Sequence, residues 1–492
     1  MNKFTWVTLW LLALAGLQGS LAFADAEPQQ TSVVQPPRLQ SLAELDEQAK
    51  TSRPLKINGW KSLFGGKVLF IRTPELPMLD LHVSFPAGST QDGVHPGLAA
   101  ATFSLLNEGV PGKDLPAILE TFDSLGAKLG MSIDPDRASF SLRTLAATEK
   151  RDPALLLFTQ ILGQPLLTDE SLSSVKKELT HILKTQQQDP ASQITHAMNE
   201  LLMPGNPYAQ PIYGTEKSVA ALSREQIQAF HRQAYTASNV LITLVGDLTL
   251  EQAQAMSLQV FNALPAGSEM AGAMPISRRQ GDTKSRHIEH PLSQTHIQLG
   301  QTGVTRQHPD YLALTVAHMI FGAQNPSSRL MKELREKRGL TYAVQLQSTF
   351  WKGGSAAVIS LKTSPQFSEG AVKLVQSMYR EYLQTGPTQQ ELDDTLRQLR
   401  ISTALNSASN AQILSRLVAI NQNDLPLDLN FSVEQAQGLT VAQIKGALNK
   451  HFDANQWSVV TVGPTVEQRP LPLPASEVPQ SMCRAETGFV AS

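Results

Sequence analysis

Two stretches of the sequence recur at nearly the same separation, and this repeat limits the possible folds more than any other feature. The dipeptide His95-Pro96 opens an apolar helical stretch, and His308-Pro309 opens a similar one 213 residues later. Near the end of each half, residues 235–246 resemble residues 452–463, which lie 217 positions further on. Two landmarks at matching separations indicate a duplicated domain of about 200 residues.

Short β-type segments alternate with longer helical ones in the first half. Segments 67–72, 79–85 and 239–245 are rich in Val, Leu, Ile and Phe and end at turn residues, as strands do. Periodicity and apolar runs predict a strand pair within 127–142 and helices over 98–106, 115–125, 153–162, 169–187, 194–202 and 224–234. The predicted fold class is therefore α+β, with two duplicated α/β sandwich domains, each a mostly antiparallel sheet covered by helices.

The start of the chain predicts export. Lys3 precedes the apolar run 4–17 and the small-residue site Ala22-Phe23-Ala24, a pattern typical of a signal peptide with cleavage after Ala24. The run is short for a membrane span, so we expect no stable span after cleavage; a retained anchor is the alternative. The lone Cys483 excludes an internal disulfide and is compatible with a bacterial periplasm, the expected location.

Composition sets the remaining boundaries and excludes some partners. A formal net charge of −2 on 492 residues gives no case for binding nucleic acid or an anionic membrane. The predicted order is a signal peptide over 1–24, a linker or arm over 25–58, a first domain over 59–264, a linker over 265–285, a second domain over 286–464 and an irregular tail over 465–492.

One segment of the second half, residues 325–342, has the signals of a complete helix followed by a turn. Asn325 suits the N-cap, Pro326 the first helical position and Gly339 a left-handed stop. Taken alone, Arg335 is expected to be a solvated arginine and Tyr342 a half-buried tyrosine of a strand.

Several motifs resemble the insulinase/pitrilysin-type zinc metallopeptidase family, which includes the mitochondrial processing peptidases. They are the run 206–217 (Asn-Pro-Tyr-Ala-Gln-Pro-Ile-Tyr-Gly-Thr-Glu-Lys), Val245-Gly246-Asp247, and the segment from Ser328 to Tyr342. The resemblance covers about residues 59–465. It implies that Arg335 and Tyr342 are the family's substrate-binding pair, whose guanidinium and phenol can hydrogen-bond peptide carbonyls or a developing oxyanion.

The family's inverted His-x-x-Glu-His zinc motif is missing. In such a motif two histidines at i and i+4 bind zinc from one helical face and the Glu activates the metal-bound water. The resemblance places Ala100 at the first His, Phe103 at the Glu, Ser104 at the second His, and His181 near the distal Glu. Ala and Phe cannot bind a metal, so we expect no metal site and no catalytic residue in this chain.

The remaining candidates do not replace that motif. His287 and His290 are three residues apart where a strand should begin, so their rings are expected on opposite faces. His82, His296 and His318 are expected to be partly buried, hydrogen-bonded structural residues. Glu108 and Glu178 lie near the degenerate motif without a His partner. Cys483 has no nearby His, and no nucleophile elbow or phosphate loop is present in a suitable context.

Three hypotheses follow. In the first, the chain is a zinc-less subunit of a periplasmic two-chain metallopeptidase, in which a zinc-bearing partner of the same family acts on a peptide or unfolded protein. The resemblance implies this division of labour in related bacterial pairs. In the second, the chain is a catalytically silent peptide-binding or scaffold protein of the cell envelope. In the third, it is a self-sufficient peptidase with an unusual metal site.

Overall fold

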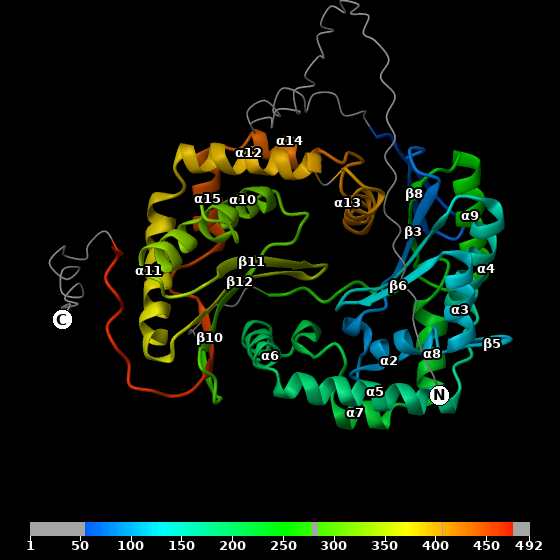
Figure 1. Cartoon of the computed structure of the whole chain (residues 1–492), viewed down its shortest axis with the longest axis horizontal. Helices are drawn as coiled ribbons and strands as arrows, with labels where there is room; N and C mark the ends of the chain where they lie inside the picture. Colours follow the sequence, from blue (N-terminus) through cyan, green and yellow to red (C-terminus); the bar gives the residue numbers. More distant parts are fainter. Residues whose placement is uncertain (1–54, 278–283, 406, 476–492) are drawn as a thin grey trace, which may run out of the picture. The chain divides into compact units, whose positions relative to one another are not determined.

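The computed structural model describes residues 55–277, 284–405 and 407–475, and each half of this region is built on one β-sheet (Figure 1). The expected signal peptide, most of the expected arm and Cys483 lie outside the described residues. All described residues fall in one compact unit. None of the described helices is long and apolar enough to cross a membrane.

The two sheets share one topology. The first has the order β1-β2-β8-β3-β7-β6 and the second the order β11-β12-β10-β13-β9. In each sheet one pair is parallel, β2 with β8 and β9 with β13, and the other neighbours are antiparallel. Without β1, the two orders are the same when read from opposite ends. The predicted fold class, two duplicated and mostly antiparallel sheets with helices, is confirmed.

The strands have the following bounds. Those of the first sheet are β1 (Ile57–Lys61), β2 (Lys67–Arg72), β3 (Met78–Phe85), β6 (Lys128–Ile133), β7 (Ala138–Leu145) and β8 (Leu241–Gly246). Those of the second are β9 (Ser285–Glu289), β10 (Thr295–Gly303), β11 (Val344–Trp351), β12 (Gly354–Thr363) and β13 (Ser458–Gly463). A separate two-stranded ribbon is formed by β4 (Gly109–Val110) and β5 (Lys113–Asp114).

The helices follow the predicted pattern, with additions. The first half contains α2 (Leu98–Leu105), α3 (Leu115–Leu125), α4 (Thr148–Gly163), α5 (Asp169–Gln188), α6 (Pro190–Leu202), α7 (Glu216–Ala221), α8 (Arg224–Ala234) and α9 (Leu250–Ala263). The second contains α10 (Tyr311–Gly322), α11 (Ser368–Thr385), α12 (Gln389–Leu405), α13 (Asn410–Asn423), α14 (Phe431–Gln437) and α15 (Val441–His451). The equivalent helices α8 and α15 both begin with a capping box, Ser223 with Gln226 and Thr440 with Gln443.

Each half lends one helix to the sheet of the other. From the first half, α6 packs on β10 and β13, and from the second, α13 packs on β8 (Figure 1). Gly300 permits the first contact, since a Cβ there would lie 2.6 Å from the sulfur of Met198. In the second contact, Nδ2 of Asn421 donates to the Ile242 carbonyl at 2.8 Å. Helix exchange of this kind joins the halves through buried apolar surface.

A polar contact joins two hairpin turns, one from each sheet. Asp136, in the β6–β7 turn, accepts hydrogen bonds from the Tyr208 hydroxyl and, at 2.8 Å, from the Lys352 backbone N–H in the β11–β12 turn. The Gly353 N–H donates to the same hydroxyl at 3.0 Å. Tyr208, in the run 206–217 that carries part of the resemblance, therefore holds the halves together.

Candidate functional site

The helix on which the resemblance places the zinc motif is α2, and its side chains serve packing. Gly97 starts the helix with φ +90°, and the Asp92 carboxylate accepts from the Gly97 and Ala99 N–H groups at 2.7 Å each. Ala100 is fully buried, and the Phe103 ring lies 5.3 Å from that of Phe140. A methyl group and a phenyl ring therefore occupy positions that a zinc site needs for ligand and base.

The facing helix α5 does not supply a replacement. His181 lies exposed on it, and its ring makes no hydrogen bond or ion pair among the described residues. Burial raises the pKa of Glu108, and the negative charge of Glu178 raises it further, so these two carboxylates lie near each other. Within the described part of the chain, the side chains of α2 and α5 do not form a group of three His, Cys, Asp or Glu ligands. The residues present do not fit a catalytic zinc ion.

The predictions for the other histidines agree with the structure only in part. His287 lies in β9 and His290 just after it, and the two line different cavities, as predicted for residues three apart in a strand. His318 is buried, and its Nδ1 lies 2.8 Å from Oγ of Ser348. Hydrogen bonds were also predicted for His82 and His296, and this was wrong for the described residues, because neither ring has a polar partner.

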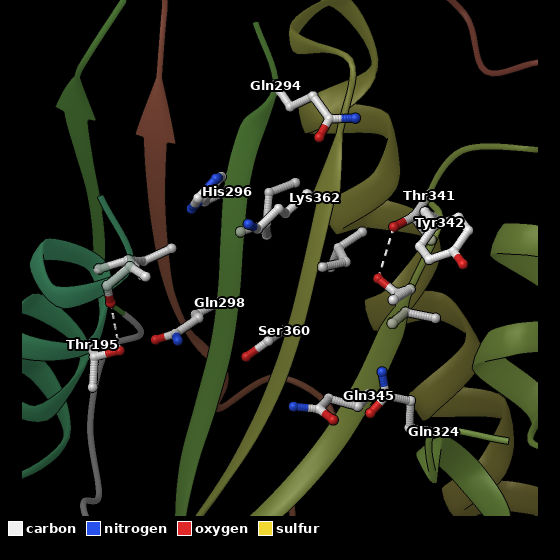
Figure 2. A pocket seen from close by; sticks show the side chains of 16 residues that line it. Thr195, Gln294, His296, Gln298, Gln324, Thr341, Tyr342, Gln345, Ser360 and Lys362 are labelled. Atoms are coloured by element: carbon white, nitrogen blue, oxygen red, sulfur yellow. Dashed lines mark hydrogen bonds between the residues drawn. The ribbon is translucent and has the colours of Figure 1, made fainter. Parts of the chain in front are cut away.

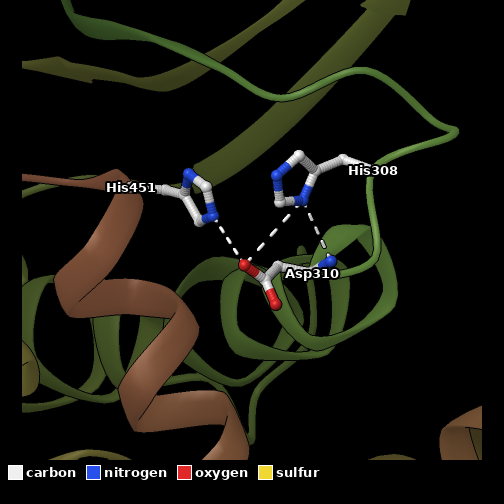
Figure 3. Close-up of side chains that lie close together, drawn as sticks. All are labelled: His308, Asp310 and His451. Carbon is white, nitrogen blue, oxygen red and sulfur yellow. Dashed lines mark hydrogen bonds and ion pairs between the residues drawn. The ribbon is translucent and has the colours of Figure 1, made fainter.

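One histidine cluster was missed by the sequence reasoning: His308, Asp310 and His451 (Figure 3). Nε2 of His451 lies 2.7 Å from Oδ2 of Asp310, and the Lys450 ammonium lies 2.9 Å from the same oxygen. Nδ1 of His308 accepts from the Asp310 N–H at 3.0 Å. The candidate ligand atoms are thus already engaged within the protein: Oδ2 of Asp310 accepts from His451 and Lys450, and Nδ1 of His308 accepts from the Asp310 N–H. The cluster ties the start of α10 to the end of α15.

The segment 325–342 differs from the regular helix that the sequence predicts. Oδ1 of Asn325 accepts from the Ser328 N–H at 3.0 Å and Gly339 has φ +60°, so both end signals act as predicted. Residues 326–327 form a turn, however, so Pro326 is not the first helical residue and that prediction was wrong. Helical residues 329–330 lead into a π-helix at Met331–Lys337. The wider winding of a π-helix changes where successive side chains point, and such turns are frequent at functional sites.

Arg335 and Tyr342 lie together at the end of this segment. The guanidinium carbon of Arg335 is 4.8 Å from the centre of the Tyr342 ring, within the range of a cation–π contact. Tyr342 is 82% exposed and precedes β11, so the expectation of a half-buried strand tyrosine is wrong. Neither the guanidinium nor the phenol makes a hydrogen bond or ion pair with a described residue. Their polar groups are free to bind a ligand.

Comparisons with known proteins agree with this geometry. Residues 221–399 match the family described as "Peptidase M16 inactive domain". A crystal structure of a peptidase M16 inactive domain from Pseudomonas fluorescens has 42% identity and a TM-score of 0.81, covering 85% of this chain and 100% of that one. The non-peptidase homolog YmxG of Helicobacter pylori is 26% identical over 402 residues, 80% of this chain and 91% of that protein.

A fourth similarity concerns the fold alone. The structure of the periplasmic protease PqqL from Escherichia coli has a TM-score of 0.69 and 15% identity, and the match covers 84% of this chain and 46% of that one. In fold, this chain corresponds to about half of that protease.

Proposed function

Since the chain belongs to the peptidase M16 family and is a catalytically inactive member of it, we propose that it is the zinc-less subunit of a periplasmic two-chain metallopeptidase. The observation that carries the proposal is the free Arg335–Tyr342 pair, exposed on a chain whose own zinc positions hold Ala100, Phe103 and Ser104. A substrate-binding pair in a chain without catalytic zinc residues suits a subunit that holds the substrate while a partner subunit cleaves it.

Arg335 and Tyr342 have the chemistry to hold a peptide. A guanidinium offers several N–H donors in one plane, and a phenol adds an O–H donor, so the two can bind a substrate carbonyl from adjacent directions. Donors fixed in place are worth most when a carbonyl oxygen gains charge during attack by water. Stacking of the guanidinium on the ring holds the donors in place before substrate arrives. The zinc ion that activates the water would belong to the partner.

The proposed location and pairing have separate support. The predicted signal peptide and the lone Cys483 are compatible with a periplasm. The fold match to about half of a periplasmic protease suits a unit that pairs with another of its kind. The partner is expected to be an M16 chain with an intact inverted zinc motif, and a neighbouring reading frame is the first place to look for it.

Reconstitution tests the proposal. Mixing the mature chain with such a partner is expected to give chelator-sensitive peptide cleavage, and Arg335→Ala is expected to lower kcat/KM by about 100-fold, as for the loss of an oxyanion donor. Tyr342→Phe keeps the ring and removes the hydroxyl, so a smaller loss is expected. Arg400→Ala, an exposed arginine of α12, serves as the matched control.

Two results would count against the assignment. Full activity of a mixture in which Arg335 and Tyr342 are both replaced would show that the pair does not bind substrate. A stable complex without cleavage of any peptide would favour the alternative, a catalytically silent peptide-binding or scaffold protein.

A further inference from the structure

A cavity of about 450 Å³ lies beside Tyr342, on the face of the second sheet that α6 partly covers (Figure 2). Because α6 packs mainly on β10 and β13, it leaves the part of this face that β12 and β11 form uncovered. The cavity is of the size that binds small groups in proteins. Its polar lining comes from Thr195, Gln294, His296, Gln298, Gln324, Thr341, Gln345, Ser360 and Lys362.

Strand register arranges the central polar side chains in two adjacent rows. His296 on β10 lies opposite Lys362 on β12. Two residues along, Gln298 lies opposite Ser360, which in turn lies opposite Gln345 on β11. Residues two apart in a strand share a face, so both rows face the cavity (Figure 2). The result is one cation and one imidazole above a row of amide and hydroxyl groups.

Lys362 is the one charged side chain of the lining, and it has no acidic partner among the described residues. His296 beside it stays largely neutral near pH 7, because burial and then the Lys362 charge lower its pKa. Asp189, a carboxylate whose charge acts on His296, caps α6 by accepting from the Ala191 and Ser192 N–H groups. The cavity therefore presents an unneutralised positive charge.

At the equivalent position of the first sheet, the cation has a carboxylate partner. Arg143 lies on the corresponding face of the first sheet, and it forms a bidentate ion pair with Asp80, with distances of 2.6 and 3.1 Å. The two residues are cross-strand neighbours. In the second half, the cross-strand neighbour of Lys362 is His296 instead of a carboxylate. No carboxylate therefore occupies the cross-strand position next to Lys362.

We propose that this cavity is a subsite for a peptide carboxylate, with the Lys362 ammonium as its counter-ion and the side-chain amides of Gln298 and Gln345 as hydrogen-bond donors. Tyr342 forms part of the cavity lining, so a peptide held by Arg335 and Tyr342 would place a neighbouring group here. The inference rests on the proposed function, because that peptide carries the carboxylate. An acidic side chain and a peptide C-terminus offer the same chemistry.

Affinity selection on the chain alone tests the subsite. The immobilised mature chain is incubated with random decapeptides whose two ends are blocked, and retained peptides are sequenced. Asp and Glu are expected to be enriched, and Lys362→Gln is expected to lower the retention of acidic peptides by about 10-fold, as for a lost charged hydrogen bond. Lys362→Arg should restore it. Lys177→Gln, an exposed lysine on α5, is the matched control.

A second pool identifies the source of the carboxylate. It lacks Asp and Glu and has either a free or an amidated C-terminus; retention that needs both the free end and Lys362 would assign the site to the peptide terminus. Absence of carboxylate-dependent retention in both pools, or retention that survives Lys362→Gln, would overturn the proposal. Carboxylate-dependent retention with no cleavage in the two-chain mixture would support the subsite and contradict the proposed peptidase function. Cleavage in the mixture without such retention would support the peptidase function and contradict the subsite.

Discussion

Arg329 and Arg335 lie six residues apart on one segment, and their surroundings are opposite. The Arg329 guanidinium forms a bidentate ion pair with Glu391, at 2.7 and 2.8 Å, donates to the Gly386 carbonyl at 3.0 Å and stacks 4.6 Å from the centre of the Tyr382 ring. The Arg335 guanidinium lies against the exposed ring of Tyr342 and has no polar partner among the described residues. The first arginine serves the fold, and the second is available for function.

We expect this difference to appear in the free energy of unfolding. Arg329→Ala should lower it by about 2 kcal/mol, because the half-buried Glu391 loses a charged hydrogen-bond partner. Arg335→Ala should change it by less than about 0.5 kcal/mol, as exposed substitutions do. Urea unfolding followed by circular dichroism measures both. Equal losses would mean that Arg335 is also structural.

Burial of His318 gives a pH dependence of stability. Burial lowers the pKa of its imidazole from 6.5 to about 3, so the folded chain keeps the ring neutral while the unfolded chain protonates it below pH 6.5. The contribution of the neutral His318 to the free energy of unfolding is therefore fully present above pH 6.5, and it falls as the pH decreases toward 3. Between pH 6.5 and 5 the expected loss from this residue is about 2 kcal/mol.

His318→Asn isolates that contribution. The variant keeps a polar atom near Ser348 but cannot titrate, so its unfolding free energy should fall less steeply between pH 6.5 and 5 than that of the wild type. Urea midpoints across this range give the comparison. Identical slopes would show that other groups, such as His82, whose pKa is also lowered by burial, dominate the pH dependence.

At the scale of elements, the exchanged helices test how the halves are joined. Leu417 of α13 is fully buried against the first sheet, in a cluster that includes Leu69 and Val245. Leu417→Ala should cost about 2 to 5 kcal/mol of unfolding free energy, because it opens a cavity there. The exposed Leu258 of α9 is the control, and Leu258→Ala should cost less than about 0.5 kcal/mol. A small effect at Leu417 would mean that α13 contributes little to the joint.

Local signals predicted most elements because they act within a few residues. The Asn325 cap, the Gly339 stop and the alternation of strands and helices all rest on neighbouring positions, and the structure agrees with them. The π-helix Met331–Lys337 was not predicted, since its winding depends on packing against the rest of the second half. The helices α7 and α9 of the first half were also missed.

The site divides in the same way. The loss of zinc ligands could be predicted from the identities of Ala100 and Phe103 alone, once the family was recognised. The cavity beside Tyr342 could not, because His296 and Lys362 are 66 positions apart and meet only through strand register. The exposure of Tyr342, 82%, was not predicted either.

At the scale of the whole molecule, duplication explains both what is present and what is missing. The two halves repeat one sheet topology, and each lends a helix to the other, so the chain folds as a unit without needing a working metal site. By the resemblance to zinc peptidases, the first half has Ala100 and Phe103 at the positions of a zinc ligand and a catalytic base. In the second half, Arg335 and Tyr342 lie against each other and have no polar partner among the described residues. On the proposed function, the missing chemistry comes from a second chain.

Continuous variation of the two chains tests this central claim most directly. Chelator-sensitive peptide cleavage is measured at constant total protein while the mole fraction of this chain runs from zero to one. We expect a maximum at equal amounts of the two chains and no cleavage by this chain alone. Cleavage by this chain alone, with stoichiometric zinc bound, would contradict the account, as would activity that simply follows the amount of the zinc-bearing partner.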